Sequence, residues 1–163
     1  MIDIEKKILF IHIPKTGGTS ITKALSGQRT HTTLRHHLLF KKRYIKNIFQ
    51  NKKKNFLLSS KILYQQKFSL KVPLIDDNYK KISIIRNPWA RAVSWYKDIL
   101  RHEPHRKAYK IPNEISFKDI LKSFGNKFWG LRPQSHWLID WEGKINIDLI
   151  CKLENLNEDW SKI

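Results

Sequence analysis

The chain has 163 residues, of which 40 % are hydrophobic and 12 % aromatic, and this is enough apolar material for one ordinary folded domain. A single cysteine excludes a disulfide framework and a multi-cysteine zinc site. The 32 Lys and Arg residues outnumber the 14 Asp and Glu residues, and the formal charge of +18 predicts a protein that attracts anions.

The first residues predict a cytoplasmic protein. Asp3 and Glu5 occupy positions where a signal peptide carries basic residues, and the apolar stretch at residues 8–13 is too short for a signal sequence. No apolar run approaches the length of a transmembrane helix. We therefore expect neither a signal peptide nor a membrane span.

Two strand–turn–helix units predict the fold class. Residues 7–13 form a nearly continuous apolar run, which is typical of a buried parallel strand. A turn at residues 14–20 leads into apolar residues at helical spacing. The same order returns with a strand at residues 81–85 and a helix at residues 89–100. Two such units predict an α/β domain with a parallel sheet.

The other segments are predicted from composition and turn signals. Residues 38–72 are basic with scattered apolar residues, and we expect a helix or a partly ordered insert there. A capping pattern at residues 116–119 predicts a helix start. Residues 145–153 have the apolar pattern of a strand, and Asn157 is predicted as the N-cap of a last helix.

The turn at residues 14–20 has the composition of a phosphate-binding loop. Gly17 and Gly18 let backbone N–H groups point inward without a Cβ clash. Lys15 adds a positive charge, and hydroxyls at positions 19 and 20 lie at a helix N-terminus, where the dipole favours an anion. The nucleotide-triphosphatase pattern G-x-x-x-x-G-K-[ST] is absent. A plain turn with a capping Thr-Ser is the alternative.

A second candidate anion site follows the second predicted strand. Arg86 lies at the carboxyl end of that strand, and Ser94 lies one or two turns into the next helix. Open parallel sheets bind ligands at this edge, and a guanidinium with a hydroxyl can hold a phosphate there. The alternative is that Arg86 pairs with a carboxylate and Ser94 only packs.

Together, the two motifs resemble the cofactor-binding motifs of the sulfotransferase family, in the branch that includes bacterial and Golgi carbohydrate sulfotransferases. F-I-H-I-P-K-T-G-G-T-S at residues 10–20 is similar to the family's 5′-phosphosulfate loop. I-I-R-N-P-W-A-R-A-V-S-W-Y at residues 84–96 is similar to its 3′-phosphate site. R-P-Q-S-H-W-L-I-D at residues 132–140 and K-L-E-N-L-N-E-D-W at residues 152–160 resemble the family's P-Q-S segment and the strand-to-helix stretch that follows it.

The resemblance implies a P-loop-like three-layer domain with a central parallel sheet flanked by helices. It also implies transfer of a sulfuryl group from 3′-phosphoadenosine 5′-phosphosulfate (PAPS) to a hydroxyl or amine of an acceptor, without a metal. The expected acceptor is a glycan or another hydroxyl compound, and no specific nucleic acid partner is expected. Lys15 would serve both catalysis and donor binding. The implied donor-binding residues are Lys15, Thr16, Gly17, Gly18, Thr19, Ser20, Arg86 and Ser94.

His31 is the predicted general base. It resembles the family's histidine that follows the first motif, and an imidazole is suited to taking a proton from an attacking hydroxyl. Thr32 and Thr33 are predicted to cap the next helix. His36 and His37 are alternative bases, and a solvent-exposed histidine without a role is the further alternative.

The chain departs from the family pattern in two places. Cys151 and Lys152 stand where the family usually has Gly-Arg, which weakens any bidentate role at that position. Family members also commonly continue with further helices. We therefore expect a single domain over residues 1–163 that is short or truncated at its C-terminus.

Two rival functions remain open on the sequence. The charge of +18 and the Lys52–Lys54 run suit a non-catalytic nucleic-acid-binding protein, although no known nucleic-acid-binding motif is present. A P-loop nucleotide kinase or hydrolase is the second rival, and the missing G-K-[ST] argues against it. The seven histidines contain no H-E-x-x-H pattern, so no metal site is predicted.

Overall fold

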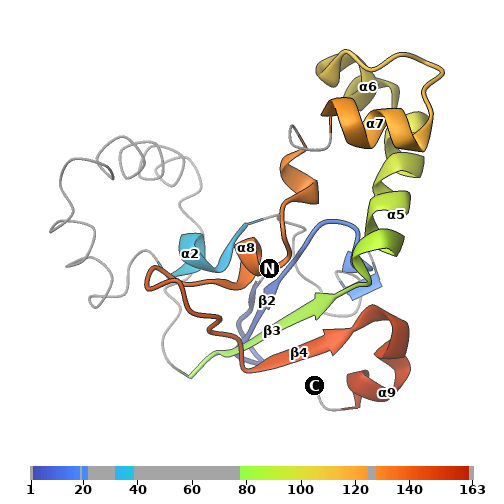
Figure 1. Cartoon of the computed structure of the whole chain (residues 1–163). Helices are drawn as coiled ribbons and strands as arrows, with labels where there is room; N and C mark the ends of the chain where they lie inside the picture. The colour runs from blue at the N-terminus through green and yellow to red at the C-terminus, as the bar shows by residue number, and fades with distance from the viewer. Residues whose placement is uncertain (1, 19, 22–31, 39–77, 125–127, 162–163) are drawn as a thin grey trace, which may run out of the picture.

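Four strands form the centre of the fold (Figure 1): β1 (Ile2–Asp3), β2 (Ile8–Ile11), β3 (Lys80–Ile85) and β4 (Leu149–Lys152). They are hydrogen-bonded in the order β1-β2-β3-β4. β1 runs antiparallel to β2, whereas β2, β3 and β4 are parallel to one another. The computed structural model describes residues 2–18, 20–21, 32–38, 78–124 and 128–161.

The predicted α/β class is confirmed, but the sheet is mixed rather than purely parallel. The strands of the two predicted units pair in parallel, with Phe10 beside Ile82. β4 continues the parallel set, with Cys151 beside Ile84. The sequence does not indicate the antiparallel β1, because a strand of two residues is too short for a periodic pattern.

Hydrophobic side chains cover both faces of the sheet. Leu9 packs on one face with residues of α2 (Leu34–His37) and α8 (Ser135–Leu138). Its neighbour Phe10 packs on the opposite face with residues of α9 (Leu156–Trp160). Successive strand residues point to opposite faces, so every residue of β2 is buried, as its continuous apolar run predicts.

α5 (Pro88–Arg101) leaves the carboxyl end of β3 and is the helix predicted at residues 89–100 (Figure 1). Asn87 starts it, because its side-chain oxygen accepts hydrogen bonds from the backbone N–H groups of Trp89 and Ala90, at 3.0 and 3.1 Å. The Asn87 cap fixes where the second motif changes from loop to helix. Two further helices follow, α6 (Glu103–Tyr109) and α7 (Phe117–Phe124).

A third hydrophobic cluster fixes α5 in place. Trp95 and Ile99 on its inner side pack with Ile120 of α7 and with Phe128. The predicted cap of α7 is confirmed, because the Ser116 hydroxyl accepts a hydrogen bond from the backbone N–H of Asp119 at 3.1 Å. Ser94 and Lys97, on other sides of α5, do not belong to this cluster.

Two predictions near the C-terminal end need correction. The strand predicted at residues 145–153 is shorter, because Ile145 forms only an isolated bridge with Ile139 before β4 begins. Asn157 is not an N-cap. A 3₁₀ turn, η3 (Leu153–Asn155), leads directly into α9, so Asn157 lies inside the helix.

Other expectations lie outside the described residues. These include residues 39–72 and the first predicted helix beyond Ile21.

Thr33 stands at the N-cap of α2 but makes no side-chain capping hydrogen bond, so its predicted capping role is wrong. Among the helices that the structure describes, none is long and apolar enough to cross a membrane.

Candidate active site

The loop after β2 reverses the chain within a few residues. Lys15 and Gly17 adopt positive φ angles of 67° and 81°, and Gly18, Ser20 and Ile21 are helical. The Thr16 hydroxyl is buried and donates a hydrogen bond to the Ile13 carbonyl at 2.8 Å. The predicted strand and turn are therefore confirmed, and the Thr16 side chain stabilises the loop itself.

Both glycines of the loop are required by their surroundings. A Cβ at position 18 would lie 1.7 Å from Nε2 of the buried His12 ring. A Cβ at Gly17 would lie 2.7 Å from Cδ1 of Leu153, and its positive φ also favours glycine. Close packing behind the loop, rather than turn geometry alone, therefore selects glycine at both positions.

Arg86 joins the two motifs. Its guanidinium Nη1 donates to the backbone carbonyl of Lys15 at 3.2 Å. Its own backbone makes two hydrogen bonds with the Gln134 side chain: Arg86 N–H donates to Oε1 at 2.9 Å, and Gln134 Nε2 donates to the Arg86 carbonyl at 2.7 Å. Gln134 belongs to the R-P-Q-S-H-W stretch, so three segments distant in sequence meet at the carboxyl end of β3.

A groove of about 320 Å³ runs along the outer side of α5. Arg86 and Ser94, which the sequence predicts to share a site, both line it. Lys97 and Arg101 line the same groove toward the end of the helix, and neither was predicted from the sequence. The available signal is their spacing from Ser94, which places them on the same helix side. The lining residues are Arg86, Ala90, Val93, Ser94, Lys97 and Arg101.

The ammonium of Lys15 is held by a carboxylate that the sequence analysis also missed. Its Nζ lies 3.0 Å from Oδ1 of Asp98, and both side chains are partly buried. Asp98 lies on α5 one turn after Ser94, so the ion pair links the loop directly to the helix that carries the groove. A carboxylate so close to an expected anion-binding residue is not deducible from either motif.

Arg91 is buried behind the loop. Its guanidinium donates hydrogen bonds to the carbonyls of Pro14 at 3.0 Å and Arg132 at 3.1 Å, and also to that of Gly130. Burial lowers the pKa of Arg91 to about 10, so it still carries its charge at neutral pH. Arg91 therefore ties the loop to the segment that precedes Gln134.

Glu154 fastens the start of α5 from the other side. Its Oε1 accepts a hydrogen bond from the backbone N–H of Asn87 at 2.7 Å. That bond, with added attraction from Arg86 and Lys152, holds the pKa of Glu154 below its ordinary value. Glu154 is thus ionised at neutral pH, and it supports the turn that carries Arg86.

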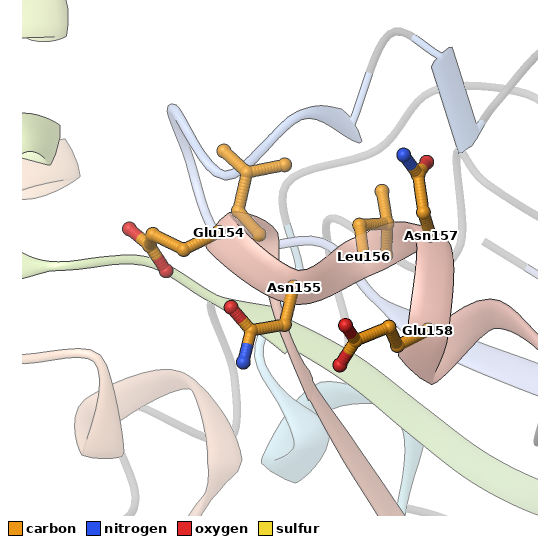
Figure 2. Close-up of a pocket in the computed structure, with 6 residues that line it drawn as sticks. Glu154, Asn155, Leu156, Asn157 and Glu158 are labelled. Carbon is orange, nitrogen blue, oxygen red and sulfur yellow. The ribbon is translucent and has the colours of Figure 1, made fainter.

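A second hollow, of about 210 Å³, lies along residues 153–158. Figure 2 shows Asn155 and Glu158 with their side chains on the same side of this turn. The lining contains two carboxylates and no cationic side chain: Leu153, Glu154, Asn155, Leu156, Asn157 and Glu158. Its charge is unsuited to a phosphate or sulfate. Of the two hollows described here, the α5 groove is therefore the better candidate for binding an anion.

The depressed pKa of Glu154 gives a pH-dependent prediction. Because this pKa lies below its ordinary value of 4.5, the stabilisation is complete above pH 4.5 and is lost as the pH falls through the folded-state pKa. Glu154→Gln keeps an oxygen acceptor for Asn87 but removes the charge. Thermal melts between about pH 3 and pH 7 should show a Tm difference between wild type and variant that is constant near neutrality and shrinks in acid. A difference independent of pH would assign no role to this charge.

Of the remaining predicted site residues, the structure describes some and not others. Thr19 and His31 lie outside the described residues, as does the side chain of His36. Ser20 is exposed in the first helical turn. His37 Nε2 lies 2.6 Å from the Thr32 hydroxyl. No group of three or more potential metal ligands occurs within the part of the chain that the structure describes.

Comparison with known protein families matches the whole chain, residues 1–163, to the sulfotransferase family. No curated protein and no solved structure gives a match to the chain. The match includes both motifs that meet at Arg86 and the R-P-Q-S-H-W stretch bound to it.

Proposed function

The chain belongs to the sulfotransferase family, and on this premise we propose that it transfers a sulfuryl group from PAPS to a hydroxyl or amine of an acceptor. Arg86 carries the proposal: it lines the α5 groove with Ser94, and its guanidinium also donates to the loop carbonyl of Lys15. One arginine thus connects two regions suited to anions. A donor with a 5′-phosphosulfate and a separate 3′-phosphate needs two such regions.

In this proposal the loop takes the 5′-phosphosulfate and the groove takes the 3′-phosphate. Gly17 and Gly18 place no side chain on the loop, so a phosphate could approach the loop backbone closely. Thr19 and Ser20 would add hydroxyl donors at the start of the first helix. Sulfuryl transfer, like phosphoryl transfer, depends mainly on positioning and on neutralising charge, which suits this set of lysine, arginine and backbone donors.

Three finer points belong to the same proposal. The acceptor is a glycan or another hydroxyl compound, and His31 takes its proton as the oxygen attacks. The sheet with its hydrophobic clusters on both faces is the core of a P-loop-like three-layer arrangement. The basic side chains of the groove favour an enzyme that binds an anionic nucleotide. The alternative, a nucleic-acid-binding protein, has no known binding motif in the sequence to support it.

Ligand-dependent melting tests the donor, and transfer tests the reaction. At physiological salt, 3′-phosphoadenosine 5′-phosphate (PAP) should raise Tm more than ATP or a DNA duplex does. Incubation with labelled PAPS and a panel of glycans, lipids and small alcohols should then label an acceptor. Stabilisation by ATP or DNA without stabilisation by PAP would instead support one of the rival functions.

Arg86→Ala should weaken PAP binding selectively. A charge-assisted contact to a phosphate contributes about 1.5–3 kcal/mol, so at least about tenfold loss in affinity is expected. Adenosine 5′-phosphate, which lacks the 3′-phosphate, should lose much less. Lys107→Ala, which removes one charge from the Lys107–Glu103 pair on α6, is the matched control. Calorimetric titration measures all four combinations, and equal losses for the two ligands with Arg86→Ala would refute the assignment.

A further inference from the structure

Three consecutive backbone carbonyls at residues 13–15, at the start of the glycine loop, each accept a hydrogen bond from a side chain. The Ile13 carbonyl accepts from the Thr16 hydroxyl, and the Lys15 carbonyl accepts from Arg86. The Pro14 carbonyl, between them, accepts from Nε of Arg91 at 3.0 Å. An anion-binding loop needs its carbonyl oxygens turned away from the ligand. The hydrogen bonds to these three carbonyl oxygens meet that need.

Arg91 differs from the other two donors because it is buried and reaches two segments. Its side chain is 4 % exposed, and its Nη atoms donate to the carbonyls of Gly130 and Arg132. A guanidinium has a rigid, planar set of donors, so three carbonyls fixed around it are held at set positions relative to one another. Arg91 therefore fixes the loop against the segment that leads to Gln134 and Arg86.

The charge of Arg91 is part of the same argument. All three acceptors found for it in the described part of the chain are neutral carbonyl oxygens. Burying a charge without a carboxylate partner is unfavourable, and a neutral residue would avoid that cost. A positive charge directly behind a loop becomes favourable when the loop holds an anion, because their attraction is weakly screened in the interior.

We propose that Arg91 is a positioning residue for the donor loop, which turns the Pro14 carbonyl away from the ligand and places a fixed positive charge behind it. This proposal rests on the proposed function, since the ligand it serves is the anionic 5′-phosphosulfate. Arg91 does not contact the donor in this scheme. It acts through the conformation and the electrostatic potential of the loop, and Arg86 and Lys15 make the contacts.

Chemical rescue tests this role. Arg91→Ala should weaken PAP binding at least about tenfold. Guanidinium chloride at a non-denaturing concentration should restore affinity relative to sodium chloride at the same ionic strength. Urea has a similar planar shape and N–H donors but no charge, so it should not restore affinity. Equal rescue by urea, or wild-type affinity in a variant with a cooperative melt, would overturn the proposal.

A matched arginine and a conservative variant complete the experiment. Arg106 also donates to a backbone carbonyl, that of Leu100 at 2.5 Å, at the far end of α5. Arg106→Ala should leave PAP affinity unchanged, and a loss equal to that of Arg91→Ala would overturn the proposal. If Arg91→Ala does not fold, Arg91→Lys decides: it keeps the charge but cannot reach three carbonyls, so wild-type affinity in this variant would overturn the proposal.

A readout without donor separates this proposal from the proposed function. Amide hydrogen exchange at residues 15–18 should be faster in Arg91→Lys than in wild type and unchanged in Arg106→Ala. Failure of wild-type protein to bind PAP would refute the proposed function, while the exchange rates would still report on the loop. Equal exchange in wild type and Arg91→Lys would refute the positioning role even if PAP binds.

Discussion

Lys15→Ala is expected to lower turnover by about 100- to 1,000-fold while PAP still binds measurably. In the proposed reaction, negative charge builds on the leaving phosphate oxygen during sulfuryl transfer, and the Lys15 ammonium would neutralise it. Because this charge is larger in the transition state than in the bound donor, the loss should fall mainly on kcat. Steady-state rates and calorimetric affinities measure the two effects separately.

The ion pair with Asp98 provides the necessary control. Lys15→Ala also leaves the Asp98 carboxylate without its partner at 3.0 Å, and that carboxylate would repel the donor. The double variant Lys15→Ala/Asp98→Ala removes both charges. If it regains wild-type turnover, repulsion by Asp98 explains the single variant, and Lys15 has no catalytic role. We expect the double variant to recover donor affinity only.

Gly18→Ala should disrupt the loop and abolish PAP binding. The new Cβ would lie 1.7 Å from Nε2 of His12, and that ring is buried and cannot swing into solvent. Overpacking of this kind costs about 1–3 kcal/mol or more, and the strain falls directly on the loop backbone. Thermal unfolding and PAP titration measure the two consequences.

A double-mutant cycle identifies the clash as the cause. His12→Ala should recover much of the stability and PAP affinity lost in Gly18→Ala, because it removes the ring that the new Cβ meets. Gly143 is the matched control: it has a positive φ of 80°, but a Cβ there would meet no atom within 4 Å. Gly143→Ala should show strain without rescue by His12→Ala. Strictly additive effects of His12→Ala and Gly18→Ala would contradict the explanation.

The parts of the site that were predicted from sequence are those carried by local patterns. The glycine turn after an apolar run predicted a loop at Lys15 and Gly17, and the structure has both residues in a turn with positive φ angles. The order of strand end, turn and helix predicted that Arg86 and Ser94 lie near each other, and both line the α5 groove. These relations depend on residues within about two helical turns of one another, so periodicity and turn composition are sufficient to predict them.

The parts that were missed depend on contacts between distant segments. Asp98 reaches Lys15, and Gln134 reaches the backbone of Arg86, through pairings that sequence spacing does not specify. Arg91 did carry a signal: it shares the spacing of Trp95 and Ile99 on the buried side of α5. A charged residue on the apolar stripe of a helix indicates a buried, hydrogen-bonded group rather than a surface charge.

The Lys15–Asp98 pair changes how anion binding at this loop should be understood. The lysine already has a counter-ion from its own chain, 3.0 Å away and partly shielded from water. Under the proposed function, an arriving donor would therefore replace the Asp98 carboxylate at Lys15 instead of meeting an uncompensated charge. The binding free energy at Lys15 would be the difference between the attraction of Lys15 to the ligand and its attraction to Asp98. A small anion that contacts Lys15 alone would therefore bind weakly. A ligand that also reaches Arg86 and Ser94 would add the contacts of the α5 groove. Under the proposed function, competition from Asp98 would thus favour ligands that also reach Arg86 and Ser94 over small anions.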